Sequence, residues 1–143
     1  MSDERRRESQ VLPFLVAALV CDVAATEPVS GKKSLIGIFD RVIAHKFPTA
    51  RQLTVYGKIA DAVGYYRVAV RFVQVKSGNV LAEASGTIMV QDRLSSTDFL
   101  VPFPMPLPLI EEGRYVFQVL MNDAVIGEAF IDATLVPDST SQE

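Results

Sequence analysis

The sequence is short of cysteine and of net charge, and both shortages narrow the class of protein. The single cysteine, Cys21, cannot form an internal disulfide, as is usual for proteins of a reducing compartment. Lysine and arginine number 14 against 17 aspartate and glutamate, and no basic stripe is interleaved with aromatic side chains. The electrostatic footprint of a nucleic-acid-binding protein is therefore missing. We expect a cytoplasmic protein with no nucleic-acid partner.

The N-terminal apolar run is too short to cross a membrane as a helix. It extends from Val11 to Cys21, whereas a bilayer requires about 20 apolar residues. Three arginines, residues 5–7, precede the run as in a signal peptide, but neighbouring acidic residues offset their charge. We interpret the run as a buried strand and expect no membrane partner. A secreted or periplasmic location is the alternative, if the run is a signal peptide.

The composition is that of one folded domain. The chain has 143 residues and is 49% hydrophobic, which is enough for a sizeable core and lies well outside the disordered class. Residues 1–10 and 138–143 are charged or polar and lack apolar periodicity, so we expect them to be disordered tails. The domain is then expected to span residues 11–137.

The clearest local structure is a hairpin near the C-terminus, from Gly113 to Val136. Side chains alternate between the two faces of a strand, so the spacing of its first arm predicts one continuous apolar face: Tyr115, Phe117, Val119 and Met121. Asn122-Asp123 predicts the turn, since both residue types tolerate positive φ. A lone hairpin is marginal in water, so another sheet must cover this face.

The length of the turn decides which side chains of the return arm face the core. A two-residue loop would place Glu128 opposite Phe117, on the apolar face. A longer loop that includes Ala124 instead brings small and apolar side chains to that face: Val125, Gly127, Ala129, Ile131 and Ala133. Because a slip of one residue turns every side chain over, we predict the longer loop.

Several further segments have the composition of strands, and turn residues separate them. Phe14 to Val23 is apolar on both faces, which predicts a central strand covered on both sides. The other predicted strands are Ser34–Ala44, Gln52–Ala60, Tyr65–Val75 with a bulge near Val73, and Val80–Val90. Roughly eight strands without an amphipathic helix predict an all-β fold, a two-sheet antiparallel β-sandwich of immunoglobulin or fibronectin-III type. A closed barrel is the alternative.

Proline occupies every second position in one stretch: Pro102, Pro104, Pro106 and Pro108. Since alternate residues of a strand direct their N–H groups to the same side, these prolines remove the donors from one edge. We predict an edge strand that resists aggregation, or an extended crossover, rather than a polyproline II segment. The large apolar residues between the prolines are a candidate interaction surface: Phe103, Met105 and Leu107.

Few polar residues suggest chemistry. Cys21, Asp22 and His45 are the one conceivable nucleophilic set, but a cysteine in so apolar a run is expected to be buried and unreactive. Asp22, Asp40 and His45 form a weaker alternative polar site, for binding a small ligand or for hydrolysis. The simpler interpretation is that each carboxylate pairs with a nearby cation, such as Lys33 or Arg41. We predict no catalytic residue, no cofactor and no metal site.

Two segments resemble an uncharacterised bacterial family catalogued as a domain of unknown function. They are Ala18–Asp22 with Gly31–Val42 (ALVCD and GKKSLIGIFDRV), and the glycine-led hairpin Gly113–Phe117 with Val125–Glu128. The resemblance implies a small all-β domain without an assigned activity, and it supplies no site residues. From the residues themselves we predict a non-catalytic interaction or structural module, whose partner is another protein or a second copy of the chain.

Overall fold

The computed structural model describes residues 12–94 and 96–137, in which the chain forms eleven strands and no helix. The strands are β1 (Phe14–Thr26), β2 (Lys33–Ile38), β3 (Arg41–Ala44), β4 (Thr49–Arg51), β5 (Thr54–Ala60), β6 (Gly64–Gln74), β7 (Val80–Val90), β8 (Thr97–Pro102), β9 (Leu107–Leu109), β10 (Gly113–Met121) and β11 (Ala124–Leu135). In the same residues, no helix is long and apolar enough to span a membrane. The predicted tails, residues 1–10 and 138–143, lie outside the described residues.

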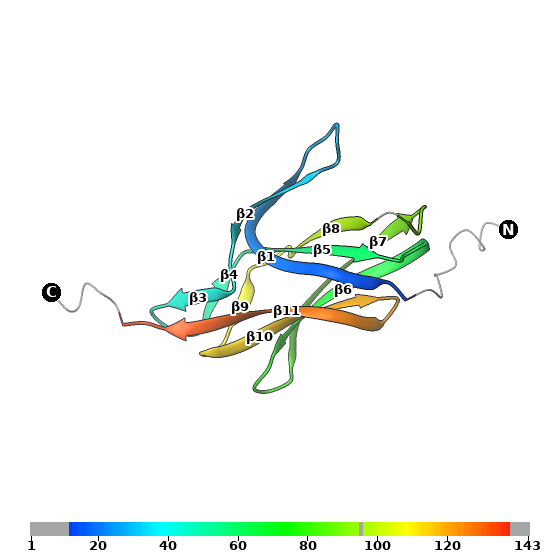
Figure 1. Ribbon diagram of the computed structural model, residues 1–143. Helices are drawn as coiled ribbons and strands as arrows, with labels where there is room; N and C mark the ends of the chain where they lie inside the picture. The colour runs from blue at the N-terminus through cyan, green and yellow to red at the C-terminus, as the bar shows by residue number, and fades with distance from the viewer. Residues whose placement is uncertain (1–11, 95, 138–143) are drawn as a thin grey trace.

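The strands build two sheets that stack as a sandwich (Figure 1). One sheet has the order β2-β1-β5-β8, the other has the order β3-β11-β10-β6-β7, and β4 pairs with β9 in a small third sheet. All pairings are antiparallel except that of β3 with β11, which is parallel. The predicted two-sheet β-sandwich is confirmed, with more strands than the sequence indicated.

The register of the C-terminal hairpin is set by a shift within its strands, and its turn is short. Met121 pairs with Ala124, so the loop has two residues, and Asn122 and Asp123 both have positive φ, 49° and 70°. The register then shifts by one residue between Val119 and Leu120. The longer loop was therefore a wrong prediction, because a β-bulge absorbs the extra residue.

The shifted register produces the predicted apolar face from Gly127 onward, whereas Val125 pairs with Leu120 and is exposed, contrary to the prediction. Phe117 pairs with Ala129 and Tyr115 pairs with Ile131, while Glu128 pairs with Gln118 on the opposite face. Ile131 is fully buried. A second bulge, predicted near Val73, is confirmed by the register shift between Phe72 and Val73 of β6 and β7.

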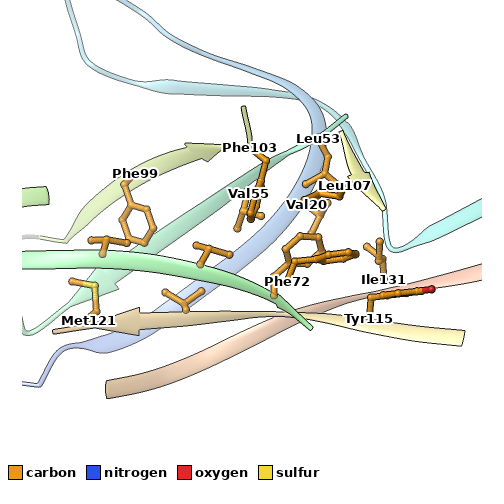
Figure 2. Packing of buried hydrophobic residues seen from close by; sticks show 14 of the residues in the cluster. Val20, Leu53, Val55, Phe72, Phe99, Phe103, Leu107, Tyr115, Met121 and Ile131 are labelled. Atoms are coloured by element: carbon orange, nitrogen blue, oxygen red, sulfur yellow. The ribbon is translucent and has the colours of Figure 1, made fainter. Parts of the chain in front are cut away.

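The core lies between the two sheets and is built around aromatic rings (Figure 2). Phe72 stacks on Tyr115 with ring centroids 5.3 Å apart, and Phe117 lies 5.0 Å from Phe72. In the other sheet, the ring of Phe99 rests on Gly57, its cross-strand partner, in space that any side chain at position 57 would occupy. Such interlocking contacts favour one sheet packing over its alternatives.

Tyr115 also holds the turn that precedes its own strand. Its hydroxyl donates a hydrogen bond to the carbonyl oxygen of Glu111 at 2.7 Å. It accepts hydrogen bonds from the backbone N–H groups of Ile110 and Glu111, at 3.0 and 3.1 Å. One buried phenol therefore satisfies three backbone groups at the entry to β10, as in the tyrosine corner of immunoglobulin-like sandwiches.

Strand β1 is central in its sheet, but only one of its faces is covered along its first half. Val20 is buried, whereas Phe14 and Val16 are 64% and 49% exposed. The prediction that this strand is covered on both sides is therefore wrong. The apolar run reflects a core face and a solvent-facing apolar face on the same strand, which composition alone does not separate.

The predicted strand Ser34–Ala44 is two strands that belong to different sheets. β2 ends at Ile38 and pairs with β1, and β3 begins at Arg41 and pairs with β11. Phe39 and Asp40 join them, so the chain passes from one sheet to the other within two residues. This short link brings Asp40 to the side of the sandwich where β1 and β11 lie next to each other (Figure 1).

The proline-rich stretch is a crossover instead of one continuous edge strand. β8, an edge strand, ends at Pro102, and β9 begins at Leu107 and pairs with β4. Phe103 lies in the connection, where its ring centroid is 6.1 Å from that of Phe117. Of the two interpretations offered by the sequence, the structure supports the extended crossover.

Candidate functional site

Asp22 marks the base of the β1–β2 hairpin. One carboxylate oxygen accepts a hydrogen bond from Nη2 of Arg51 at 2.6 Å, and the guanidinium carbon of Arg51 lies 4.7 Å from the centroid of the Phe39 ring. The carboxylate fills the space beside Gly37, whose φ is +72°. Asp22 therefore has a structural role at this bend, and its cation is Arg51 instead of the expected Lys33 or Arg41.

The structure does not bring the three residues of the alternative polar site together in one cavity. Asp40 lines a cavity between β1 and β11, and His45 lines a different cavity near β3 and β4. Nδ1 of His45 lies 3.0 Å from the carbonyl oxygen of Val136, and Asp22 lines neither cavity. Across residues 12–94 and 96–137, no group of three metal-ligating side chains occurs.

Cys21 is placed as an inert thiol. It is fully buried, and its sulfur lies 3.6 Å from the carbonyl oxygen of Thr54. Burial raises the pKa of the thiol, and the charge of Asp22 raises this pKa further. A raised pKa reduces the thiolate fraction on which nucleophilic chemistry depends.

The predicted interaction surface on the proline-rich stretch is mostly core. Phe103 and Leu107 are each 2% exposed and pack into the sandwich, while Met105 is 71% exposed. The connection between β8 and β9 directs Phe103 and Leu107 into the core and leaves Met105, between them, at the surface. Met105 alone of the three could meet a partner.

An open side of the sandwich forms where β1 and β11 run next to each other. β2 pairs with β1 only from Cys21 onward, and β3 pairs with β11 only from Asp132 onward. Among the described residues, the first half of each strand therefore has one backbone edge without a strand partner. The two strands touch where Leu15 lies against Gly127. Farther along, β1 turns away from β11 (Figure 1).

A cavity of about 390 Å³ lies in this opening, and we call it the seam groove. Its lining comes from β1, from the end of β2 with the β2–β3 link, and from β11: Ala18, Leu19, Val20, Ile38, Phe39, Asp40, Glu128, Ala129 and Phe130. Most of these side chains are apolar, and the two charged ones are both carboxylates. Hydrophobic walls with a few polar groups are the usual composition of a binding groove.

Arg114 fixes the outer rim of the seam groove. Its guanidinium donates two hydrogen bonds to the carboxylate of Asp132, at 2.8 and 3.0 Å, and stacks 3.9 Å from the centroid of the Phe130 ring. The hydrogen bond to Asp132 raises the pKa of Arg114, and the charges of Asp132 and Asp40 add to this effect. The same hydrogen bond lowers the pKa of the Asp132 carboxyl, and the charge of Arg41 contributes.

The second exposed feature is the β1–β2 hairpin, which projects from the two stacked sheets (Figure 1). Val23 pairs with Ile36, and Cys21 pairs with Ile38, so these side chains share one face. On that face Val23, Ile36 and Ile38 are 56%, 66% and 56% exposed. Lys33 ties the hairpin to β8 through an ion pair with Asp98 at 3.4 Å.

Sequence reasoning missed both features. The exposed hairpin face has a signal, because Val23, Ile36 and Ile38 are apolar residues beside a turn, but strands of a core have the same composition. The seam groove has no local signal. It depends on where β2 and β3 stop pairing with their neighbours, which a single strand pattern does not show.

Comparison with known proteins places the chain in a family without assigning an activity. No curated protein matches the chain. Among solved structures, an immunoglobulin-like protein from Pseudomonas aeruginosa is similar, at 10% identity and a TM-score of 0.35, over 90% of this chain and 95% of that one. A family model matches residues 16–134, and its description is a family of unknown function, DUF6941. The chain belongs to this family of unknown function.

Proposed function

We propose that the chain is a non-catalytic β-sandwich module that binds another protein chain through the β1–β2 hairpin. The observation that carries the proposal is the exposed apolar face of this hairpin, formed by Val23, Ile36 and Ile38. It projects from the body of the sandwich (Figure 1). Contiguous apolar side chains on a projecting element are typical of interaction sites.

The backbone of β2 adds a second means of contact. β2 is the outermost strand of its sheet, so its outer edge has no strand partner among the described residues. No proline protects it, and its one charged residue, Lys33, is engaged by Asp98. An unprotected edge is a template for a strand of another chain.

Burial of Val23, Ile36 and Ile38 would contribute substantially to the free energy of binding. Burying a fully exposed valine or isoleucine contributes about 1.5–3 kcal/mol, so the partly exposed side chains of the hairpin face contribute roughly 1 kcal/mol each. Three such side chains, together with backbone pairing, support a specific contact of moderate strength after the cost of association is subtracted.

Support for a non-catalytic role comes from the placement of the polar groups. Asp22 is engaged by Arg51, Asp40 and His45 line different cavities, and the thiol of Cys21 is buried with a raised pKa. A nucleophile and its base need to lie within hydrogen-bond reach. The polar contacts of Cys21, Asp22 and His45 are with Thr54, Arg51 and Val136 instead of with one another.

The test compares the wild-type chain with Ile36→Lys by size-exclusion chromatography with light scattering, over a wide concentration range. If the partner is a second copy, the wild-type dimerises and Ile36→Lys is monomeric. Met105→Lys is the matched control, because Met105 is equally exposed but lies on the crossover, and this variant should behave as the wild-type.

If the wild-type is monomeric, a photo-crosslinking amino acid at position 36, used in host cells, identifies a different partner. A discrete adduct at position 36 that is absent at position 105 supports the hairpin as the contact surface. Equal adducts at both positions, or none at position 36, refute the proposal.

A further inference from the structure

We propose that the seam groove binds a short, extended peptide that carries a lysine or arginine side chain. The peptide adds as a strand to the free edge of β11, and its cation lies between the carboxylates of Asp40 and Glu128. The groove shares Ile38 with the hairpin face, but its acidic lining and the edge of β11 lie outside that face, and the inference goes beyond the function proposed for the hairpin.

The backbone of β11 supplies the template. β3 occupies the outer edge of β11 only from Asp132 to Leu135. Leu15 lies against Gly127, and among the described residues the stretch from Glu128 to Ile131, between this contact and β3, has no strand partner on its outer edge. Four residues of strand span about 13 Å, which suits a short extended segment that continues the line of β3 along the same edge.

The charge of the groove favours a cation. Asp40 and Glu128 are its two charged lining residues, and neither side chain forms a hydrogen bond or an ion pair with the described residues. Arg114, which stacks on Phe130 of the lining, is held by Asp132. Two carboxylates that no cation of the described residues holds in an ion pair, beside an apolar wall, complement a lysine or arginine, whose stem is apolar and whose head is charged.

The walls provide contacts for the neighbouring side chains of such a peptide. Leu19, Ile38 and Phe130 are partly exposed, at 37%, 56% and 39%, although they line a concave surface. Phe130 is held in place by the guanidinium of Arg114. A groove volume of about 390 Å³ is sufficient for a few side chains but not for a folded element.

The test uses a blocked, fluorescein-labelled pentapeptide of alternating valine and lysine, titrated with the full chain and followed by fluorescence anisotropy. We expect saturable binding that weakens a few-fold in Asp40→Asn and in Glu128→Gln, and by tenfold or more in the double variant. Glu83→Gln removes a carboxylate of β7, outside the groove lining, and should leave the affinity unchanged.

Backbone pairing has its own readout. The N–H of Asp132 points to the outer edge of β11, so those of Glu128 and Phe130 do as well, and their hydrogen exchange should slow when the unlabelled peptide binds. N-methylation of alternate peptide amides should abolish binding. The corresponding valine–glutamate peptide should not bind. Ile36→Lys should bind the lysine peptide as the wild-type does, so failure of the hairpin proposal and failure of the groove proposal are distinguishable.

Three outcomes would overturn the proposal. The first is the absence of saturable binding at millimolar peptide. The second is binding that the double variant does not weaken. The third is occupation by something else: lysine amide binding as tightly as the pentapeptide, or self-association of the chain that Glu128→Gln abolishes, would assign the groove to a free amine or to a second copy.

Discussion

Tyr115→Phe should destabilise the fold far more than the loss of one oxygen atom suggests. The hydroxyl is buried and serves three backbone groups of Ile110 and Glu111. Each hydrogen bond contributes about 0.5–1.5 kcal/mol, and groups left unsatisfied add a desolvation cost, so the expected loss is about 2–3 kcal/mol. An unfolding entropy of about 2.1 cal/mol/K per residue gives a chain of this length about 0.3 kcal/mol/K, so Tm should fall by about 7–10 °C.

The assay is urea and thermal unfolding of wild-type and variant, followed by circular dichroism. Tyr56→Phe is the matched control, since its hydroxyl donates a single hydrogen bond to Asp98 at 3.0 Å at a half-buried position. This control should lose about 1 kcal/mol or less. If Tyr115→Phe and Tyr56→Phe lower Tm by the same small amount, the turn before β10 does not depend on the phenol and the reasoning is refuted.

Two further predictions concern the interior. Gly57→Ala should lose about 1–3 kcal/mol in urea unfolding, because the new methyl group meets the ring of Phe99. Gly57→Ala combined with Phe99→Leu should lose less than the sum of the two single variants. An additive loss in the double variant would contradict this contact. Cys21 should react with a thiol reagent much more slowly in the native chain than in urea, because burial and then Asp22 raise the pKa of its thiol. Since this pKa is raised in the folded state, the associated stability is complete below the pKa of an unfolded thiol, about 8.5, and is lost as the pH rises above it. In Cys21→Ala the free energy of unfolding should fall less steeply with pH. If its slope between pH 7 and 9.5 is the same as in the wild-type, the thiol of Cys21 is not the group responsible.

The fold was predictable because its strongest signals are local. The alternation from Tyr115 to Met121 determines a core face, and Asn122-Asp123 determines a turn, whatever the rest of the chain does. The error in the loop length arose because a bulge in β11 and a longer loop have the same effect on the register of Phe117 and Ala129. Sequence patterns report which face a residue occupies better than they report where a register shift takes place.

The candidate sites were less predictable because they depend on long-range placement. The proline pattern predicts Phe103 and Leu107 at the surface, but the crossover between β8 and β9 directs them into the core. The sequence indicates Asp40 as a polar candidate, but nothing in it places Glu128 beside Asp40. The two residues line the same groove because β11 and the β2–β3 link converge there, 88 positions apart in the sequence.

The two-residue link between β2 and β3 has a mechanical consequence. Phe39 and Asp40 are continuous with the projecting hairpin on one side, and they form part of the groove lining on the other. A partner that shifts β2 therefore moves a wall of the groove, and a ligand in the groove restrains the hairpin in return. Thermodynamic linkage makes such an effect mutual, so binding at the hairpin would change the affinity of the groove by the same factor as binding in the groove changes that of the hairpin.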